Sequence, residues 1–187
     1  MYKRQNFTLI LGDNIFSGGS DIPNSVTGFT SGALVFAYHV PDPERYAVLE
    51  FNKKMEIQSL VEKPIKPKSN YAVPGFYIYD KEAIQIAKTL NPSSRGEYEI
   101  TDINLKYLEK GKLQVHRLSR GFAWLDSGTS SSLHNASNYV AAIEQRQGMK
   151  IGCPEEASLI RGFINLKDLK KLALKMPECE YSNYLFK

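Results

Sequence analysis

The chain has 187 residues, which is the usual length of one domain and enough to bury a sizeable core. Hydrophobic residues make up 42% and charged residues 24%, which is typical of a globular protein and excludes a disordered or fibrous chain. The formal net charge is +4, but the basic residues are dispersed among 20 acidic ones. This dispersal favours a mixed, solvated surface over a face that binds nucleic acid.

Apolar runs and cysteines indicate the cellular compartment of the protein. No apolar run approaches the ~20 residues that a membrane-spanning helix requires. No signal peptide can be recognised at the first residues. Cys153 and Cys179 have neither metal-ligand spacing nor a second pair, so we expect a reducing compartment, the cytoplasm.

The first five residues are unusual for another reason. Met1-Tyr2-Lys3-Arg4-Gln5 can be encoded by the end of a transposase adapter used in sequencing libraries. We interpret residues 1–5 as an artefact of that origin, in which case the reading frame begins inside a gene. The alternative is chance or a genuine polar amino terminus.

Apolar periodicity and turn residues predict strands and helices in alternation. Strands are predicted over residues 7–11, 33–40, 46–51, 57–62, 75–79, 113–118 and 122–125. Helices are predicted over residues 81–90, 98–109, 131–147 and 166–175. The first two strands are apolar enough to be buried. Residues 17–31 are rich in Gly, Ser, Thr and Pro, which predicts a loop or a poor helix.

The alternation predicts a layered α/β domain with a mostly parallel sheet. Ligands of such sheets bind beyond the carboxyl ends of the strands. Asp13 follows the first predicted strand and Asp126 follows the last, so both are expected at that edge. Two carboxylates there suit Mg²⁺, which completes its shell with phosphate oxygens and water. Taken singly, each aspartate is more typical of a turn.

Glu62, Lys63 and Pro64 place an acid and a base at the end of a predicted strand. The carboxylate is suited to accepting hydrogen bonds from sugar hydroxyls, and the ammonium to meeting a phosphate. The alternative is a surface ion pair. The three histidines have no mutual ligand spacing, and no nucleophilic serine motif or Walker-type loop is found.

A set of short segments then gives a more specific indication. In chain order they are Leu11-Gly12-Asp13-Asn14, Asp42-Pro43-Glu44-Arg45-Tyr46, Val61-Glu62-Lys63-Pro64, Pro67-Lys68-Ser69-Asn70-Tyr71-Ala72-Val73, Arg95-Gly96-Glu97, Glu99-Ile100-Thr101-Asp102-Ile103-Asn104 and Trp124-Leu125-Asp126-Ser127-Gly128-Thr129. Glu144-Gln145-Arg146-Gln147-Gly148 and Cys153-Pro154-Glu155-Glu156 extend the set. Together they resemble the bacterial glucose-1-phosphate thymidylyltransferases.

The resemblance implies a layered, Rossmann-like nucleotide-diphospho-sugar transferase fold of the α/β class, with a mixed, mostly parallel sheet that is incomplete at the amino terminus. It implies a partial nucleotidyltransferase domain over residues 6–150 and a helical extension of that domain over residues 151–187. It assigns Mg²⁺ to Asp13 and Asp126, with Lys63 as a third catalytic residue. It assigns the sugar phosphate to Tyr46, Ala47, Glu62, Lys63 and Val73. Arg120, Gly121 and Glu155 resemble parts of a second, regulatory nucleotide site.

The sequence also departs from the family pattern. Ala47 replaces a glycine whose backbone approaches the sugar, so its methyl group is expected to crowd the substrate. The amino-terminal Gly-Gly-x-Gly-Thr-Arg-Leu loop, its following lysine and the residues that read the base are absent. That loop supplies main-chain donors to the triphosphate, so we expect little or no turnover from these residues alone.

The activity implied is the reaction of dTTP with α-D-glucose 1-phosphate and Mg²⁺ to give dTDP-glucose and pyrophosphate, in dTDP-rhamnose and deoxysugar biosynthesis. The family commonly forms homotetramers, so we expect a cytoplasmic homo-oligomer without nucleic-acid or membrane partners. Two alternatives stay open. One is a sister enzyme that uses UTP, CTP or ATP, and the other is a non-catalytic module for sugar-phosphate binding or assembly.

Overall fold

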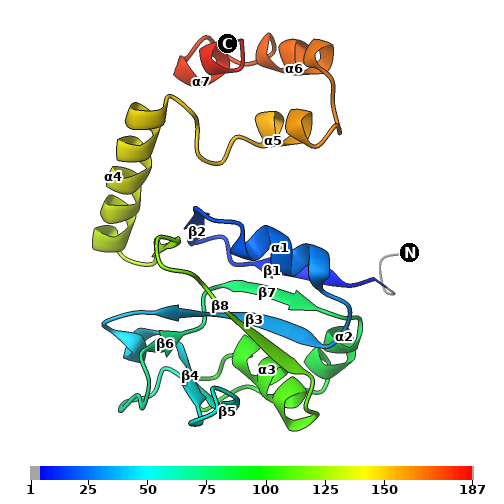
Figure 1. Cartoon of the computed structure of the whole chain (residues 1–187), viewed down its shortest axis with the longest axis vertical. Helices are drawn as coiled ribbons and strands as arrows, with labels where there is room; N and C mark the ends of the chain where they lie inside the picture. Colours follow the sequence, from blue (N-terminus) through cyan, green and yellow to red (C-terminus); the bar gives the residue numbers. More distant parts are fainter. Residues whose placement is uncertain (1–4, 187) are drawn as a thin grey trace. The chain divides into compact units, whose positions relative to one another are not determined.

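The computed structural model describes residues 5–186 and divides into two compact units, Met1–Gly128 and Thr129–Lys187 (Figure 1). A helical extension is predicted from residue 151, and the second compact unit includes it but begins earlier, at Thr129. The functional meaning given to each segment stays a prediction. Of residues 1–5, interpreted as adapter-derived, residues 1–4 lie outside the described residues.

The first unit contains the strands. They are β1 (Phe7–Ile10), β2 (Asn14–Ser17), β3 (Ala33–His39), β4 (Ala47–Phe51), β5 (Ile57–Glu62), β6 (Tyr71–Ala72), β7 (Phe76–Tyr79), β8 (Leu113–Arg117) and β9 (Ala123–Asp126). Its helices are α1 (Asp21–Gly28), the 3₁₀ turn η2 (Pro43–Arg45), α2 (Glu82–Ala87) and α3 (Ile100–Glu109). The α/β class is therefore confirmed.

The main sheet has the order β1-β7-β3-β6-β4-β5, with β8 beside β3. The expectation of a mostly parallel sheet is wrong, because β3 and β8 form the one parallel pair among the described strands. The cause is local for β4 and β5. The Asn52 side chain accepts hydrogen bonds from the backbone N–H of Lys54 and Glu56 and closes a short turn, which joins only antiparallel strands.

The core lies on both faces of β3, whose side chains alternate between them. Val35 and Ala37 pack with Tyr107 of α3 and with residues of α2 on one face. Leu34 and Phe36 pack on the other face with Ile22 of α1 and with Phe76, Ile78 and Phe122. Because strands and helices pack closely here, the loops at the ends of the strands are anchored to a rigid core.

The structure agrees with one local expectation, contradicts another and adds a contact that was not expected. Residues 17–31, predicted as a loop or a poor helix, contain the helix α1, in which Pro23 is tolerated because it lies in the first turn. The first strand was expected to be buried, yet all four β1 residues are exposed because β1 lies at the edge of the sheet. The short strand β2 follows it after a turn and pairs with β9, a contact that the local sequence does not indicate.

The second unit is helical, with α4 (Ser130–Gln147), α5 (Pro154–Ile160), α6 (Leu166–Ala173) and α7 (Glu180–Tyr184). Thr129 and Ser132 form a capping box at the start of α4, and Gly148 ends it in the left-handed region at φ 68°. A small core contains Cys153, Leu169, Ala173 and Leu185. Within residues 5–186, no helix has the length and apolar character needed to cross a membrane.

Candidate functional site

A cavity of about 440 Å³ opens in the first unit where several strand ends meet. Its walls come from the turn between β1 and β2, the start of β4, the end of β5, the segment before β7, the start of α3 and the end of β9. The sequence-predicted residues that line it are Asp13, Tyr46, Ala47, Glu62, Lys63, Val73 and Asp126. The fold thus brings every predicted substrate and metal residue to one place.

Pairing of β2 with β9 brings the two aspartates together. Asn14 lies opposite Asp126 in the ladder. The Asp13 carbonyl accepts hydrogen bonds from the backbone N–H of Ser127 at 2.8 Å and from its hydroxyl at 3.0 Å, although 114 positions separate these residues. Both carboxylates line the same cavity, as expected, but the antiparallel pairing of β2 with β9 brings them together and not the edge of a parallel sheet.

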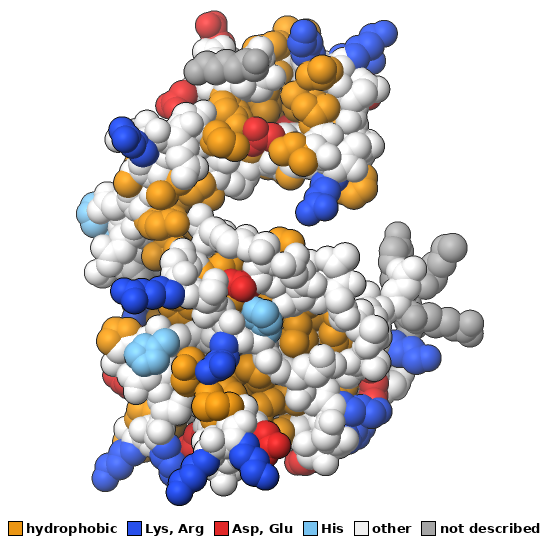
Figure 2. All heavy atoms as spheres, viewed as in Figure 1, with side chains coloured by type: hydrophobic (Ala, Val, Ile, Leu, Met, Phe, Trp, Pro, Cys, Tyr) orange, Lys and Arg blue, Asp and Glu red, His pale blue; other side chains and the backbone are white. Residues whose placement is uncertain are grey.

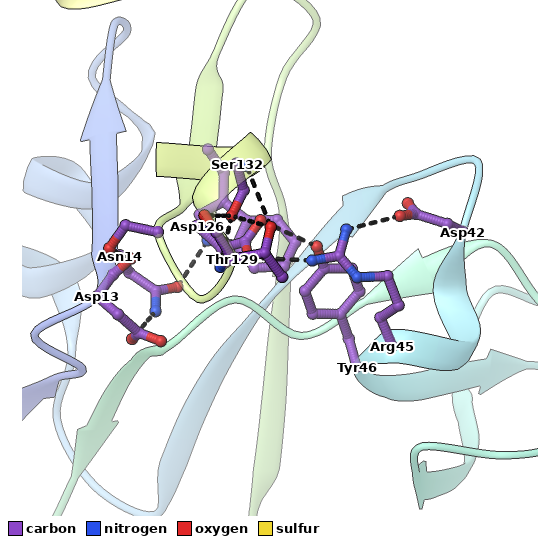
Figure 3. Close-up of polar contacts among 10 residues, drawn as sticks. Asp13, Asn14, Asp42, Arg45, Tyr46, Asp126, Thr129 and Ser132 are labelled. Carbon is purple, nitrogen blue, oxygen red and sulfur yellow. Dashed lines mark hydrogen bonds and ion pairs between the residues drawn. The ribbon is translucent and has the colours of Figure 1, made fainter. Parts of the chain in front are cut away.

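The Asn14 side chain makes three hydrogen bonds in the cavity, and no separate role was predicted for it. Its side-chain oxygen accepts hydrogen bonds from the indole N–H of Trp124 at 2.6 Å and from the backbone N–H of Gly75 at 3.0 Å. Its amide nitrogen donates to Asp13 Oδ1 at 2.7 Å (Figure 3). One side chain thus ties β9 and the start of β7 to the Asp13 carboxylate.

Asp126 is held by two donors from the segment before β4 (Figure 3). The Arg45 guanidinium donates to Oδ2 at 3.1 Å, and the Tyr46 hydroxyl donates to Oδ1 at 3.2 Å. Burial, together with the Asp126 charge, raises the pKa of Tyr46 to about 12. Tyr46 therefore stays protonated at neutral pH and serves as a donor.

Glu62 and Lys63 end β5 at the cavity wall. The Glu62 carboxylate accepts a hydrogen bond from the buried hydroxyl of Thr101 in the first turn of α3, and the Arg95 guanidinium lies 3.9 Å away. Lys63 has φ 41°, in the left-handed region that non-glycine residues rarely occupy, and its N–H donates to the Tyr46 carbonyl at 3.1 Å. This strained backbone carries the Lys63 side chain to the cavity.

Ala47 and Val73 form an apolar part of the wall. The Val73 N–H donates to the Ala47 carbonyl at 2.8 Å, and both side chains belong to the core cluster that contains Val35. The Ala47 side chain is 8% exposed. Its predicted crowding of the substrate stays a prediction.

The carboxylates of the cavity suit a hard divalent cation that also takes ligands from outside the protein. Asp13 and Asp126 offer carboxylate oxygens, which Mg²⁺ prefers. Within the part of the chain that the structure describes, no group of three or more His, Cys, Asp or Glu residues could enclose an ion. Two carboxylates without a closed cage match a cation that shares its shell with phosphate oxygens and water.

The residues of the predicted regulatory site are distributed over both units. Arg120 and Gly121 line a second cavity, of about 510 Å³, in the first unit. Glu155 belongs to the helical unit, where it accepts a hydrogen bond from the Tyr181 hydroxyl. The regulatory role of these three residues stays a prediction.

Asn14, Arg45 and Thr101 are the site residues that sequence reasoning missed as functional. Each lies in one of the segments on which the family resemblance rests. Asn14 and Arg45 are also adjacent in sequence to Asp13 and Tyr46, which was the available indication for these two. The partner of each side chain comes from a distant part of the chain, so its contact could not be assigned beforehand.

Comparisons with known proteins show the family to which the chain is related. The sequence matches the family model for nucleotidyl transferases over residues 1–143. It is 47% identical over 179 residues to the glucose-1-phosphate thymidylyltransferase of Xanthomonas campestris pv. campestris (strain B100), an alignment that covers 95% of this chain and 61% of the relative. The corresponding protein of Mycolicibacterium smegmatis is 49% identical over 95% of this chain and 62% of its own length. This chain therefore spans about three-fifths of these relatives.

Solved structures give the same result for the fold. A crystal structure described as a glucose-1-phosphate thymidylyltransferase from Bacillus anthracis, in complex with sucrose, has a TM-score of 0.64 at 42% identity and covers 73% of this chain and 55% of its own. A UDP-glucose pyrophosphorylase complexed with UDP-glucose has a TM-score of 0.62 at 23% identity, covering 73% and 56%. The second likeness concerns the fold alone. The chain belongs to the nucleotidyl transferase family.

Proposed function

We propose that this chain carries the sugar-phosphate and metal half of a glucose-1-phosphate thymidylyltransferase. The whole enzyme would convert dTTP and α-D-glucose 1-phosphate into dTDP-glucose and pyrophosphate. The observation that carries the proposal is the single cavity shared by Asp13, Asp126, Glu62 and Lys63. The likeness to proteins named glucose-1-phosphate thymidylyltransferase, over 95% of this chain, supports the choice of substrates.

In the proposed reaction, a phosphate oxygen of glucose 1-phosphate attacks the α-phosphorus of dTTP in line. The new P–O bond forms as the bond from the α-phosphorus to the bridging oxygen breaks, and pyrophosphate leaves with that oxygen. Such a transfer depends on positioning and charge neutralisation and needs no protein nucleophile. Nucleotidyl transfer generally uses a divalent metal, and we propose Mg²⁺, held by Asp13 and Asp126, to neutralise charge on the phosphate oxygens.

The residues of the cavity have separate tasks in this proposal. Glu62 accepts hydrogen bonds from sugar hydroxyls, and the Thr101 hydroxyl fixes its carboxylate in advance. Lys63 balances the charge of the sugar phosphate. Tyr46, Ala47 and Val73 form the wall against which the sugar lies. Asn14 holds the Asp13 carboxylate in place.

The setting of the enzyme is also proposed from the family resemblance. We propose a cytoplasmic homo-oligomer, a tetramer, that supplies dTDP-glucose for dTDP-rhamnose and related deoxysugars. Arg120 and Gly121 would belong to a second nucleotide site that regulates it, together with Glu155. The cavity of about 510 Å³ lined by Arg120 and Gly121 supports this assignment.

Binding of glucose 1-phosphate to the 187-residue chain, followed by saturation-transfer NMR, tests the sugar half directly. Glu62→Gln is expected to weaken binding about ten-fold, because a carboxylate accepts stronger hydrogen bonds from hydroxyls than an amide does. The matched control is Glu56→Gln, an exposed glutamate beside the opposite end of β5. Equal affinities for Glu62→Gln and the unsubstituted chain would contradict the sugar assignment.

Pyrophosphate release by the full-length gene product tests the proposed nucleotidyl transfer and the choice of nucleotide. It is measured with Mg²⁺, glucose 1-phosphate and each of dTTP, UTP, CTP and ATP in turn. Release with dTTP that Asp126→Asn abolishes is the expected result. Faster release with another nucleotide would identify a sister enzyme, and sugar-phosphate binding without any release would identify a non-catalytic module.

A further inference from the structure

The two aspartates of the cavity differ in what surrounds their carboxylates. Within the described residues, the Asp13 carboxylate accepts a hydrogen bond only from the uncharged Asn14 amide. Asp126 has both oxygens engaged, one by the Arg45 guanidinium at 3.1 Å and the other by the Tyr46 hydroxyl at 3.2 Å. A positive charge therefore already lies against one of the two groups proposed to hold the metal (Figure 3).

Arg45 makes two further contacts in the same position, and neither depends on Asp126. Its other guanidinium nitrogen, Nη1, pairs with Asp42 at 2.9 Å, and its Cζ lies 5.2 Å from the centre of the Tyr46 ring. The side chain is 41% exposed, so it can move without disturbing the core. If Arg45 left Asp126, Asp42 and the Tyr46 ring would still hold its charge.

We infer that Arg45 is a displaceable counter-ion of Asp126, which neutralises this carboxylate until a divalent cation takes its place. The inference rests on the proposed function for the identity of the cation site. Its physical basis is that a guanidinium and a divalent cation repel each other and cannot both lie against one carboxylate without cost. Arg45 is thus a positioning residue that keeps Asp126 oriented and lowers the affinity of the empty site for metal.

The size of the effect follows from the exposure of the ion pair. Breaking a partly exposed pair of this kind changes an equilibrium by about two- to five-fold. Removing Arg45 is therefore expected to raise the affinity for Mg²⁺ by about five-fold. Removing Asp42 leaves Asp126 as the remaining carboxylate against the guanidinium, so Asp42→Asn is expected to lower the affinity by about two-fold.

Tryptophan fluorescence offers a way to follow the exchange of Arg45 for Mg²⁺ at Asp126. Trp124 is the one tryptophan of the chain, its ring centre lies 4.8 Å from that of Tyr46, and it precedes Asp126 by two positions in β9. Its indole N–H donates to Asn14, which in turn holds Asp13. We therefore expect Trp124 fluorescence to respond to changes at both carboxylates.

The experiment is a MgCl₂ titration of Trp124 fluorescence at constant ionic strength. It compares the unsubstituted chain with Arg45→Met, Asp42→Asn and the charge-conserving control Arg45→Lys. We expect about five-fold tighter binding for Arg45→Met, about two-fold weaker binding for Asp42→Asn, and less than two-fold change for Arg45→Lys. Thermal unfolding followed by circular dichroism establishes that each variant is folded.

A second readout separates displacement from a general effect of charge. The Nε–H resonance of Arg45, identified by its loss in Arg45→Met, is expected to shift with Mg²⁺ in the unsubstituted chain and to stay unchanged in Asp126→Asn. Equal Mg²⁺ affinities for Arg45→Met and the unsubstituted chain would overturn the inference. So would an Arg45 resonance that ignores Mg²⁺, or a Trp124 signal that responds in no variant.

These outcomes are independent of sugar binding. If the chain binds glucose 1-phosphate but Arg45→Met leaves the Mg²⁺ affinity unchanged, the inference about Arg45 is wrong and the proposed function still stands. If Arg45→Met raises the Mg²⁺ affinity but the chain fails to bind glucose 1-phosphate, the proposed sugar assignment is wrong and the inference about Arg45 still stands.

Discussion

The two compact units differ in what holds their elements together. In the first, aromatic and aliphatic side chains form clusters on both faces of β3, with Val35, Phe36 and Tyr107 fully buried. In the helical unit the buried cluster is small, and large apolar side chains such as Ile160 and Phe163 are 73% and 81% exposed. Figure 2 shows hydrophobic side chains among the charged ones on the surfaces of both units.

Polar contacts make up part of that difference. In the helical unit, the Tyr181 and Tyr184 hydroxyls donate to Glu155 and Glu156, and Lys150 pairs with both Glu144 and Glu180. These polar contacts supplement the small buried cluster of the helical unit. The cavity lined by Asp13 and Asp126 lies in the first unit, where a dense core gives rigid strand ends.

The largest expected effect is the loss of a core leucine. Leu49 on β4 is completely buried, and Leu49→Ala is expected to lower the free energy of unfolding by about 3 kcal/mol because it leaves a cavity. Leu169→Ala in the helical unit, where the side chain is 6% exposed, is expected to cost less because a smaller cluster can collapse. Urea unfolding measures both, and equal losses would break the comparison.

The next effect concerns the carboxylate that ties the helices to the sheet. Asp80 accepts hydrogen bonds from the Tyr107 hydroxyl at 2.6 Å, from the N–H of Gly32 at 2.8 Å and from the N–H of Glu82 at 2.9 Å. Asp80→Asn is expected to cost about 2 kcal/mol, as charged hydrogen bonds are lost. Asp168→Asn, on a half-buried residue of α6 whose carboxylate lies 3.8 Å from the Lys171 ammonium, is the matched control.

The same residue predicts a pH dependence. Burial alone would raise the pKa of Asp80, but its hydrogen bonds from Tyr107, Gly32 and Glu82 lower it below its ordinary value. The folded pKa is thus below the unfolded one, so the stabilisation is present above about pH 4 and is lost as the pH falls through the folded value. The difference in unfolding free energy between the unsubstituted chain and Asp80→Asn should shrink below pH 4, and a constant difference would contradict this.

A smaller effect is expected at the cavity itself. Thr101→Val keeps the shape of a buried side chain that is 2% exposed but removes the hydroxyl that donates to Glu62. The affinity for glucose 1-phosphate should fall by roughly ten-fold, or about 1.5 kcal/mol, because the carboxylate loses a fixed orientation. Thr101→Ser restores the donor and should restore binding. A Thr101→Ser chain as weak as Thr101→Val would indicate a packing role instead.

The smallest effect is expected in the helical unit. Tyr181→Phe removes the hydroxyl that donates to Glu155 and lies 3.3 Å from Cys153 Sγ. A loss of about 1 kcal/mol is expected, visible as faster amide hydrogen exchange over α5 to α7 with no change over β3. Faster exchange in β3 as well would show that the two units unfold together.

Much of the architecture could be predicted from local sequence. Strand β3, the hairpin of β4 and β5, and helices α3 and α4 lie within a few residues of their expected ranges, because apolar periodicity and turn residues act over short distances. Asp13 and Asp126 were expected at neighbouring strand ends, and both line one cavity.

What the sequence by itself determined is therefore the α/β class, the order of the elements and the candidate residues carried by the family segments. Tertiary structure alone decided that β7 runs antiparallel to β1 and β3, that β2 pairs with β9, and that Arg45 lies against Asp126. The physical reason is that strand partners and ion pairs join distant segments, and their choice depends on which surfaces the whole core brings together.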